Sequence, residues 1–122
     1  MRVYLAGPIS GMPENNFPAF HRAAADLRAA GHEVFNPAEF GAEKSESDRR
    51  AILRDELAWI CDHAEAIALM PGWERSRGAT AELALANAID LKVLRLTATN
   101  QAIGSVDHPS DRRNPYPARY RP

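Results

Sequence analysis

The sequence has little cysteine, no long apolar run and no excess of charge of either sign. Among 122 residues there is one cysteine, Cys61, which cannot form an internal disulfide and which we expect to be packed beside Trp59 and Ile60. No apolar stretch approaches the ~20 residues that a membrane helix requires. With a formal net charge of -1, the chain also has no overall basic field for long nucleic acid or an acidic membrane surface.

Recognisable metal ligands are missing as well. The histidines are scattered, without the clustered spacing of zinc ligands, so we expect no metal and no cofactor. The N-terminus runs directly into an apolar strand and shows no charged, then apolar, then cleavable leader. These features predict a cytoplasmic protein whose partner is a small polar molecule.

Strand-like and helix-like segments alternate along residues 1–97. Short apolar runs predict strands at Arg2–Ala6, His32–Asn36, Ala66–Met70 and Lys92–Leu96. Helical periodicity predicts helices over residues 17–30, 48–63 and from 77 onward, the first capped by Asn15 or Asn16 and ended by Gly31, the second capped by Ser47 or Asp48. This order predicts one small doubly wound α/β domain of the flavodoxin or Rossmann type, with a parallel sheet of four to five strands and helices on both faces.

Residues 98–122 differ in character, because they are rich in proline and arginine. Such a segment cannot build a core of its own, so we expect it to be docked on the body or on a neighbouring subunit, or else disordered. Tyr116 and Tyr120 favour docking.

Two loops that follow predicted strands are candidate binding segments. After the first strand come Gly7, Pro8, Ile9, Ser10 and Gly11, where backbone amides and a hydroxyl could hold an anion or sugar hydroxyls. The alternative is an ordinary tight turn. Because ligands of open α/β sheets bind outside the carboxyl ends of the strands, the loop after the third strand belongs to the same crevice.

That second loop leads into a helix with three notable positions. Ser76 could cap the helix or donate to a phosphate, and free amides near Gly78 could add to an anion site. Trp73 could stack on a base or simply cover the sheet edge. Glu82 lies in the opening turns, where the helix dipole favours an ionised carboxylate that could act as a nucleophile, although a solvated helix residue is the alternative.

A third candidate is acidic. Asp55, Glu56 and Asp62 lie on the predicted second helix, and retaining cleavage of a glycosidic bond needs a second group, ~5 Å from the nucleophile, to protonate the departing base. Asp55 or Glu56 could be that group. Charges on a solvated helix face are the ordinary alternative.

Taken together, VYLAGPISG and ALMPGWERSRGATAELALA resemble the nucleoside 2-deoxyribosyltransferase superfamily, in particular its short bacterial and phage branch, over about Arg2 to Leu96. The resemblance implies that Glu82, in a G-x-x-x-E-L element, attacks the anomeric carbon of a (deoxy)ribosyl group. It also implies that Tyr4 orients this carboxylate and that Glu56 or Asp55 assists the leaving base. Family members assemble as dimers or larger oligomers, so a homo-oligomer is expected.

Position 76 indicates the substrate class within this resemblance. Transferases that act on free nucleosides carry an aspartate six residues before the nucleophile, whereas relatives that hydrolyse nucleoside 5′-monophosphates carry a serine. Ser76 therefore predicts an N-glycosidase of nucleoside 5′-monophosphates, with Arg75 and Arg77 in support. The alternatives are a nucleoside 2-deoxyribosyltransferase and a non-catalytic nucleotide-binding module.

Overall fold

The computed structural model describes residues 1–41, 48–99 and 102–106. Within these ranges the helices and strands follow the predicted alternation, with one added short helix, two 3-10 turns and one added strand. In chain order they are β1 (Arg2–Ala6), η1 (Pro13–Asn16), α1 (Phe17–Ala29), β2 (Glu33–Phe35), α2 (Ala38–Gly41), α3 (Arg49–His63), β3 (Ala66–Leu69), η3 (Trp73–Arg75), α4 (Arg77–Ala88), β4 (Lys92–Leu96) and β5 (Ala102–Val106).

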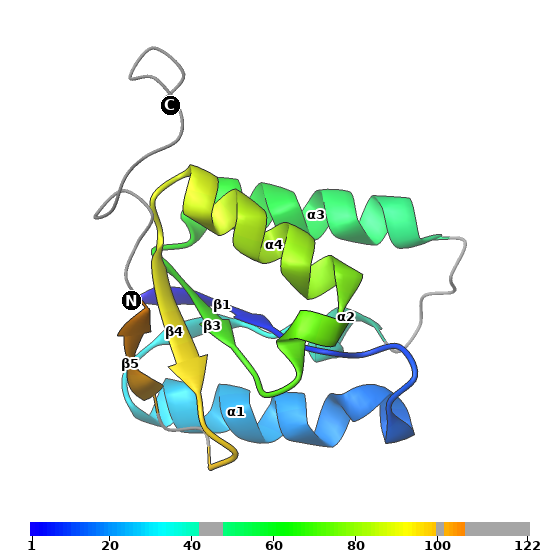
Figure 1. Ribbon diagram of the computed structural model, residues 1–122, viewed down its shortest axis with the longest axis horizontal. Coiled ribbons are helices and arrows are strands. Elements are labelled where there is room, and N and C mark those ends of the chain that lie inside the picture. The colour runs from blue at the N-terminus through cyan, green and yellow to red at the C-terminus, as the bar shows by residue number, and fades with distance from the viewer. Residues whose placement is uncertain (42–47, 100–101, 107–122) are drawn as a thin grey trace.

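The strands form one sheet in the order β2-β1-β3-β4-β5. Strands β1 to β4 are parallel, and β5 pairs antiparallel with β4. Helix α1 covers one face of the sheet, while α3 and α4 cover the other (Figure 1). This confirms the predicted doubly wound α/β fold, in the strand order of flavodoxin-like sheets.

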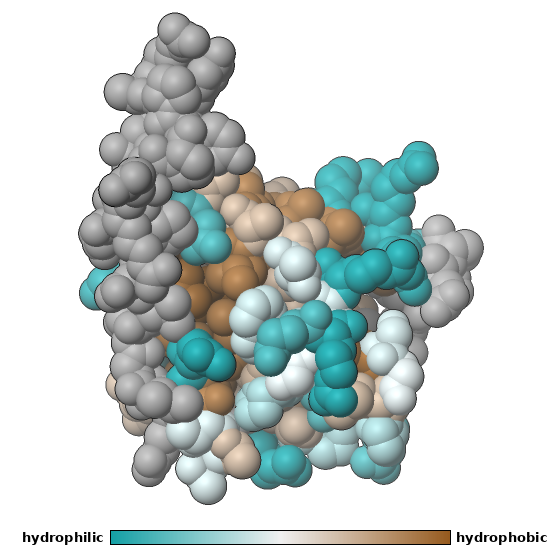
Figure 2. Space-filling view, viewed as in Figure 1, coloured by the Kyte–Doolittle hydropathy of each residue, from teal (hydrophilic) through white to brown (hydrophobic). Residues whose placement is uncertain are grey.

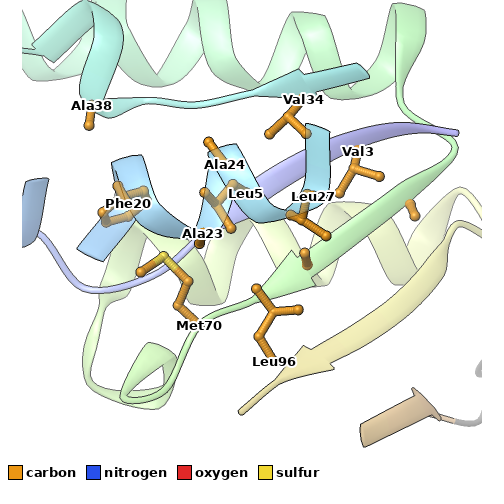
Figure 3. Close-up of a cluster of buried hydrophobic side chains, with 12 residues drawn as sticks. Val3, Leu5, Phe20, Ala23, Ala24, Leu27, Val34, Ala38, Met70 and Leu96 are labelled. Carbon is orange, nitrogen blue, oxygen red and sulfur yellow. The ribbon is translucent and has the colours of Figure 1, made fainter. Parts of the chain in front are cut away.

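Strand β1 supplies side chains to both layers of the core. Because successive residues of a strand point to opposite faces, Val3 and Leu5 join an apolar cluster with Phe20 and Leu27 of α1 (Figure 3). Tyr4 and Ala6 face the other way and join a cluster under α3 and α4. The four residues are buried, as expected of a parallel strand that is covered on both sides.

The helices begin and end near the predicted residues, but the predicted side-chain caps of α1 and α3 are not formed. Asn16 precedes α1, but in a left-handed conformation and without a capping hydrogen bond. Its side-chain amide instead donates to the carbonyl of Pro8 at 2.9 Å. Gly31 follows the end of α1 with φ +99°, as a left-handed cap should. Asp48 precedes α3 without a side-chain cap, and Ser47 lies outside the described residues.

Helix α3 is less buried than its sequence pattern indicated. Of the four apolar residues expected to be covered, only Ile60 is buried, and Ile52, Leu53 and Leu57 are half-buried. Cys61 is exposed, so the prediction of a packed thiol was wrong. Position 61 follows buried Ile60 by one residue, which is a rotation of about 100° around the helix, and this places the thiol on the solvent side.

Part of the segment that the sequence assigned to the tail belongs to the sheet. Residues 102–106 form β5, with Ala102 opposite Leu96 and Val106 opposite Val93. Residues 107–122, including Tyr116 and Tyr120, lie outside the described residues. Across the described ranges, the helices are too short or too polar to cross a membrane.

Candidate active site

The site is built around the hydroxyl of Tyr4, which lies under α3 and α4. The hydroxyl oxygen is 2.6 Å from Oε2 of Glu56 on α3 and 2.6 Å from Oε2 of Glu82 on α4. The two carboxylate oxygens can therefore be no more than twice that distance apart, about 5.2 Å. Three elements that are distant in the sequence thus bring two carboxyl groups onto one phenol.

Both contacts cannot be made by the phenol proton alone. A tyrosine hydroxyl carries one hydrogen, whereas an ionised carboxylate only accepts. One of the two carboxyl groups must therefore be protonated and donate to the Tyr4 oxygen, while Tyr4 donates to the other. The network is satisfied when the two carboxyl groups hold one proton between them.

Burial decides which carboxyl group holds this proton. Glu82 is 4% exposed, while Glu56 is half-buried. Burial, together with the hydrogen bond and negative charge of Glu56, raises the pKa of Glu82 from 4.5 to about 10. Burial and the charges of Glu82 and Glu56 also raise the pKa of Tyr4 well above its ordinary value. These effects favour the protonated form of Glu82 over the ionised form.

These effects oppose the predicted influence of the helix dipole, which favours an ionised Glu82. A helix dipole contributes about 0.3–1 kcal/mol, less than one pKa unit. Desolvation and a neighbouring carboxylate act in the opposite direction and are larger.

The structure also distinguishes the two neighbouring acids of α3. Glu56 reaches Tyr4, whereas Asp55 points to solvent and contacts Arg54 at 3.4 Å, with 60% of its side chain exposed. Asp62 is exposed as well. Of the three acidic candidates on this helix, only Glu56 belongs to the site.

The loops after β1 and β3 lie side by side at the carboxyl ends of these strands. The chain leaves β1 toward α1 on one face and leaves β3 toward α4 on the other (Figure 1), so this is a point at which open α/β sheets bind ligands. A Cβ on Gly7 would lie 2.9 Å from Cβ of Met70, and one on Gly72 would lie 3.4 Å from Cγ of Pro8. The absence of side chains at both glycines allows this close approach.

The predicted loop residues 7–11 separate into two groups. Gly7 and Pro8 are buried, and Ile9 packs against the apolar cluster on the α1 side. Ser10 and Gly11 are exposed. The contact with Met70 explains the glycine at position 7 by packing, whereas Ser10 is free to face a ligand.

The start of α4 keeps hydrogen-bonding capacity for a ligand. Ser76 caps the helix, its hydroxyl oxygen accepting from the amide of Ala79 at 3.1 Å, which leaves the hydroxyl proton available to donate. A Cβ on Gly78 would meet only the Ser76 hydroxyl at 3.8 Å, an ordinary contact. Space alone therefore does not require glycine at position 78.

The surroundings of Tyr4 are aromatic, which the sequence did not predict. Its ring stacks on Phe35 of β2 at 5.3 Å and lies 6.4 Å from Trp59 of α3. Trp73 packs against this same layer, which supports its reading as a cover for the sheet. In the sequence, this layer is represented by Phe35, which ends β2, and by Trp59, which follows Glu56 by three positions.

Comparison with known sequences identifies the family. No curated protein matches the chain. The family model described as "Domain of unknown function (DUF4406)" matches residues 1–95. That range contains Tyr4, Glu56 and Glu82 and both loops at the carboxyl ends of β1 and β3. The chain therefore belongs to the DUF4406 family.

Proposed function

We propose that the protein is an N-glycosidase that cleaves the base from a (deoxy)nucleoside 5′-monophosphate through a covalent glycosyl-Glu82 intermediate. The observation that carries this proposal is the pair of carboxyl groups on one tyrosine hydroxyl. Their contacting oxygens lie at most about 5.2 Å apart, which is shorter than the ~6.5–9.5 Å of inverting glycosidases and leaves the retaining route.

The shared proton supplies the acid for the first step. On substrate binding, Glu82 passes its proton to the Tyr4 oxygen as Tyr4 passes its own to Glu56. The Glu82 carboxylate then bonds to the anomeric carbon, the carbon–nitrogen bond breaks with its electron pair on the base, and Glu56 protonates the base. In the second step water attacks the same carbon, gives a proton to Glu56 and releases Glu82.

The side from which a substrate arrives follows from the exposure of the two acids. Glu82 is almost completely covered, while Glu56 is half-buried. We infer that the sugar approaches past Glu56 and completes the exclusion of water from the pair. No metal or cofactor takes part in this scheme.

A chromatographic screen of the common ribo- and deoxyribonucleoside 5′-monophosphates tests the proposal. The wild-type protein is expected to release free base and a sugar phosphate from at least one of them. Glu82→Gln is expected to lower this rate at least about a thousandfold, because the nucleophile is lost. Base release that survives in Glu82→Gln would overturn the role of this residue.

The same chemistry allows transfer in place of hydrolysis. If a second base reaches the glycosyl-Glu82 intermediate before water, the protein is a nucleoside 2-deoxyribosyltransferase, the function of the superfamily that its motifs resemble. Adding a free acceptor base to the screen separates the two outcomes, since transfer yields a new nucleotide and hydrolysis a sugar phosphate.

A non-catalytic nucleotide-binding module is the second candidate function. It is favoured by one observation, the burial of Glu82, which is 4% exposed and whose pKa is raised by that burial. This candidate predicts a nucleotide-dependent rise in melting temperature without base release, and the same rise in Glu82→Gln.

We also propose that the protein acts in the cytoplasm as a homodimer or larger homo-oligomer. The support is the resemblance, together with Phe40, which is 56% exposed on α2 and stacks on Phe35 beside Tyr4. Light scattering of the purified protein tests the assembly. A monomer at all concentrations would contradict it.

A further inference from the structure

The ring of Tyr4 lies between side chains of the two neighbouring strands. In the sheet register Tyr4 is opposite Phe35 of β2 and opposite Ile67 of β3, and all three side chains belong to the layer under α3 and α4. The Phe35 ring stacks on the Tyr4 ring with an interplanar angle of 21°. The plane of the phenol is therefore set on one side by another flat ring.

Trp59 connects the same rings to the helix that carries Glu56. Residues three positions apart lie on the same face of a helix, so Trp59 and Glu56 face the sheet together. The Trp59 ring lies 5.1 Å from the Phe35 ring and 6.4 Å from the Tyr4 ring, and it also contacts His63 at 5.7 Å. These contacts fix the rotation of α3 at which Glu56 reaches the Tyr4 hydroxyl.

Phe35 also separates Tyr4 from solvent. In Figure 2 apolar side chains gather along α4 and the neighbouring part of α3, the two helices that cover Tyr4. Strand β2 is at the edge of the sheet, so its side chain stands on the open side of the Tyr4 ring. Phe35 is half-buried, whereas Tyr4 is fully buried. A smaller side chain at position 35 would let water approach the hydroxyl.

The Tyr4 hydroxyl needs a fixed position because its two contacts are short. Both are 2.6 Å, within the ~2.5–2.7 Å of hydrogen bonds from a hydroxyl to an ionised carboxylate. Such bonds weaken steeply when their geometry changes. Glu56 faces the hydroxyl from α3 and Glu82 faces it from α4. Any rotation of the phenol moves its oxygen away from at least one of these carboxyl groups.

We propose that Phe35 is a positioning residue of this site, whose stacking holds the Tyr4 hydroxyl between Glu56 and Glu82 and keeps water from all three groups. Phe35 acts through Tyr4. Its part in the reaction rests on the proposed function, in which this hydroxyl passes a proton between the acid and the nucleophile.

The matched variants are Phe35→Leu and Phe17→Leu. Both remove the ring of a half-buried phenylalanine, but Phe17 packs against the apolar cluster on the α1 side. The hydroxyl proton of Tyr4 is expected as an NMR resonance that Tyr4→Phe lacks. Its exchange with water should become about tenfold faster in Phe35→Leu, the scale expected for the loss of an aromatic pair. In Phe17→Leu the exchange rate should stay within about twofold of the wild-type rate.

Steady-state kinetics on the preferred monophosphate give a second measurement. In Phe35→Leu, kcat is expected to fall about tenfold to a hundredfold, the scale on which displacements of up to 1 Å act, while KM stays within about twofold. Phe17→Leu should leave both constants within about twofold. If Phe35→Leu does not fold, Phe35→Met takes its place, because a methionine fills the space without supplying a flat ring.

Two results would overturn the role of Phe35: unchanged hydroxyl exchange in Phe35→Leu, or an equal change in Phe17→Leu. Either would leave any observed Glu82-dependent release of base in place. If the wild-type protein releases no base from any nucleotide, the proposed function fails, and the exchange comparison still decides whether Phe35 holds the Tyr4 hydroxyl.

Discussion

The two faces of the sheet differ although the same strand, β1, supplies both. On the α1 side, Val3 and Leu5 belong to a cluster of buried apolar side chains (Figure 3). On the other side, Tyr4 carries a hydroxyl into an equally buried layer, where it meets two carboxyl groups. Burial on the first face stabilises the fold. On the second, burial raises the pKa of Glu82, so the same physical effect changes the ionisation of a carboxyl group.

The first way to test this contrast is to separate the two neighbouring acids of α3. Glu56→Gln is expected to lower the rate of base release about 10²- to 10⁴-fold, the usual contribution of a general acid. Asp55→Asn should change it by less than about twofold, because Asp55 faces solvent and contacts Arg54. Steady-state rates on the preferred monophosphate give the comparison. A larger loss in Asp55→Asn would show that the assignment is inverted.

A substitution on the apolar face should lower stability and leave the catalytic rate unchanged. Leu5→Ala is expected to lower the free energy of unfolding by about 2–5 kcal/mol, because Leu5 is fully buried and the change leaves a cavity. Urea unfolding measures this loss. Below the unfolding transition, the catalytic rate and its pH profile should be those of the wild-type protein. A shifted pH profile would mean that the two faces are not independent.

A further prediction concerns the pH dependence of stability. The pKa of Glu82 is about 10 in the folded protein and about 4.5 when unfolded. Between these values the folded protein holds a proton that the unfolded chain has lost. The contribution of Glu82 to stability is therefore complete below pH 4.5 and is lost progressively as pH rises toward 10.

Urea unfolding of the wild-type protein and of Glu82→Gln between pH 5 and pH 9 measures this contribution as a difference. The variant should lack the decline that is due to Glu82, so the wild-type curve should fall more steeply with pH. Parallel curves would show that the carboxyl group is not protonated in the folded state.

Much of the fold could be predicted from the sequence because its signals are local. The bounds of β1 and β4 are as predicted, and Gly31 ends α1 through its own conformational freedom. The position of strand β5 was not predicted, because this strand is defined by its antiparallel pairing with β4 and not by a pattern in its own sequence. Asn16 was expected to cap a helix, but its amide found the carbonyl of Pro8, a contact that only the folded loop provides.

Most residues of the site could be predicted from the sequence, but the ionisation of their side chains could not. Motif resemblance indicated Tyr4 and Glu82, and the structure brings them together. Choosing between Asp55 and Glu56 required the rotation of α3, because adjacent residues point about 100° apart on a helix. Predicting the raised pKa of Glu82 requires its degree of burial and its distance from Glu56. Neither quantity can be read from sequence spacing.

The most direct test of this account is a carbon-13 NMR titration of the side-chain carboxyl of Glu82 in the free protein. We predict that this carbon keeps the chemical shift of a protonated acid from pH 4 to pH 8 and titrates only near 10. Replacing Glu56 by Gln should move the midpoint downward, since the negative charge that opposes ionisation is removed. A midpoint near 4.5 in the wild-type protein would contradict the shared proton and the mechanism that depends on it.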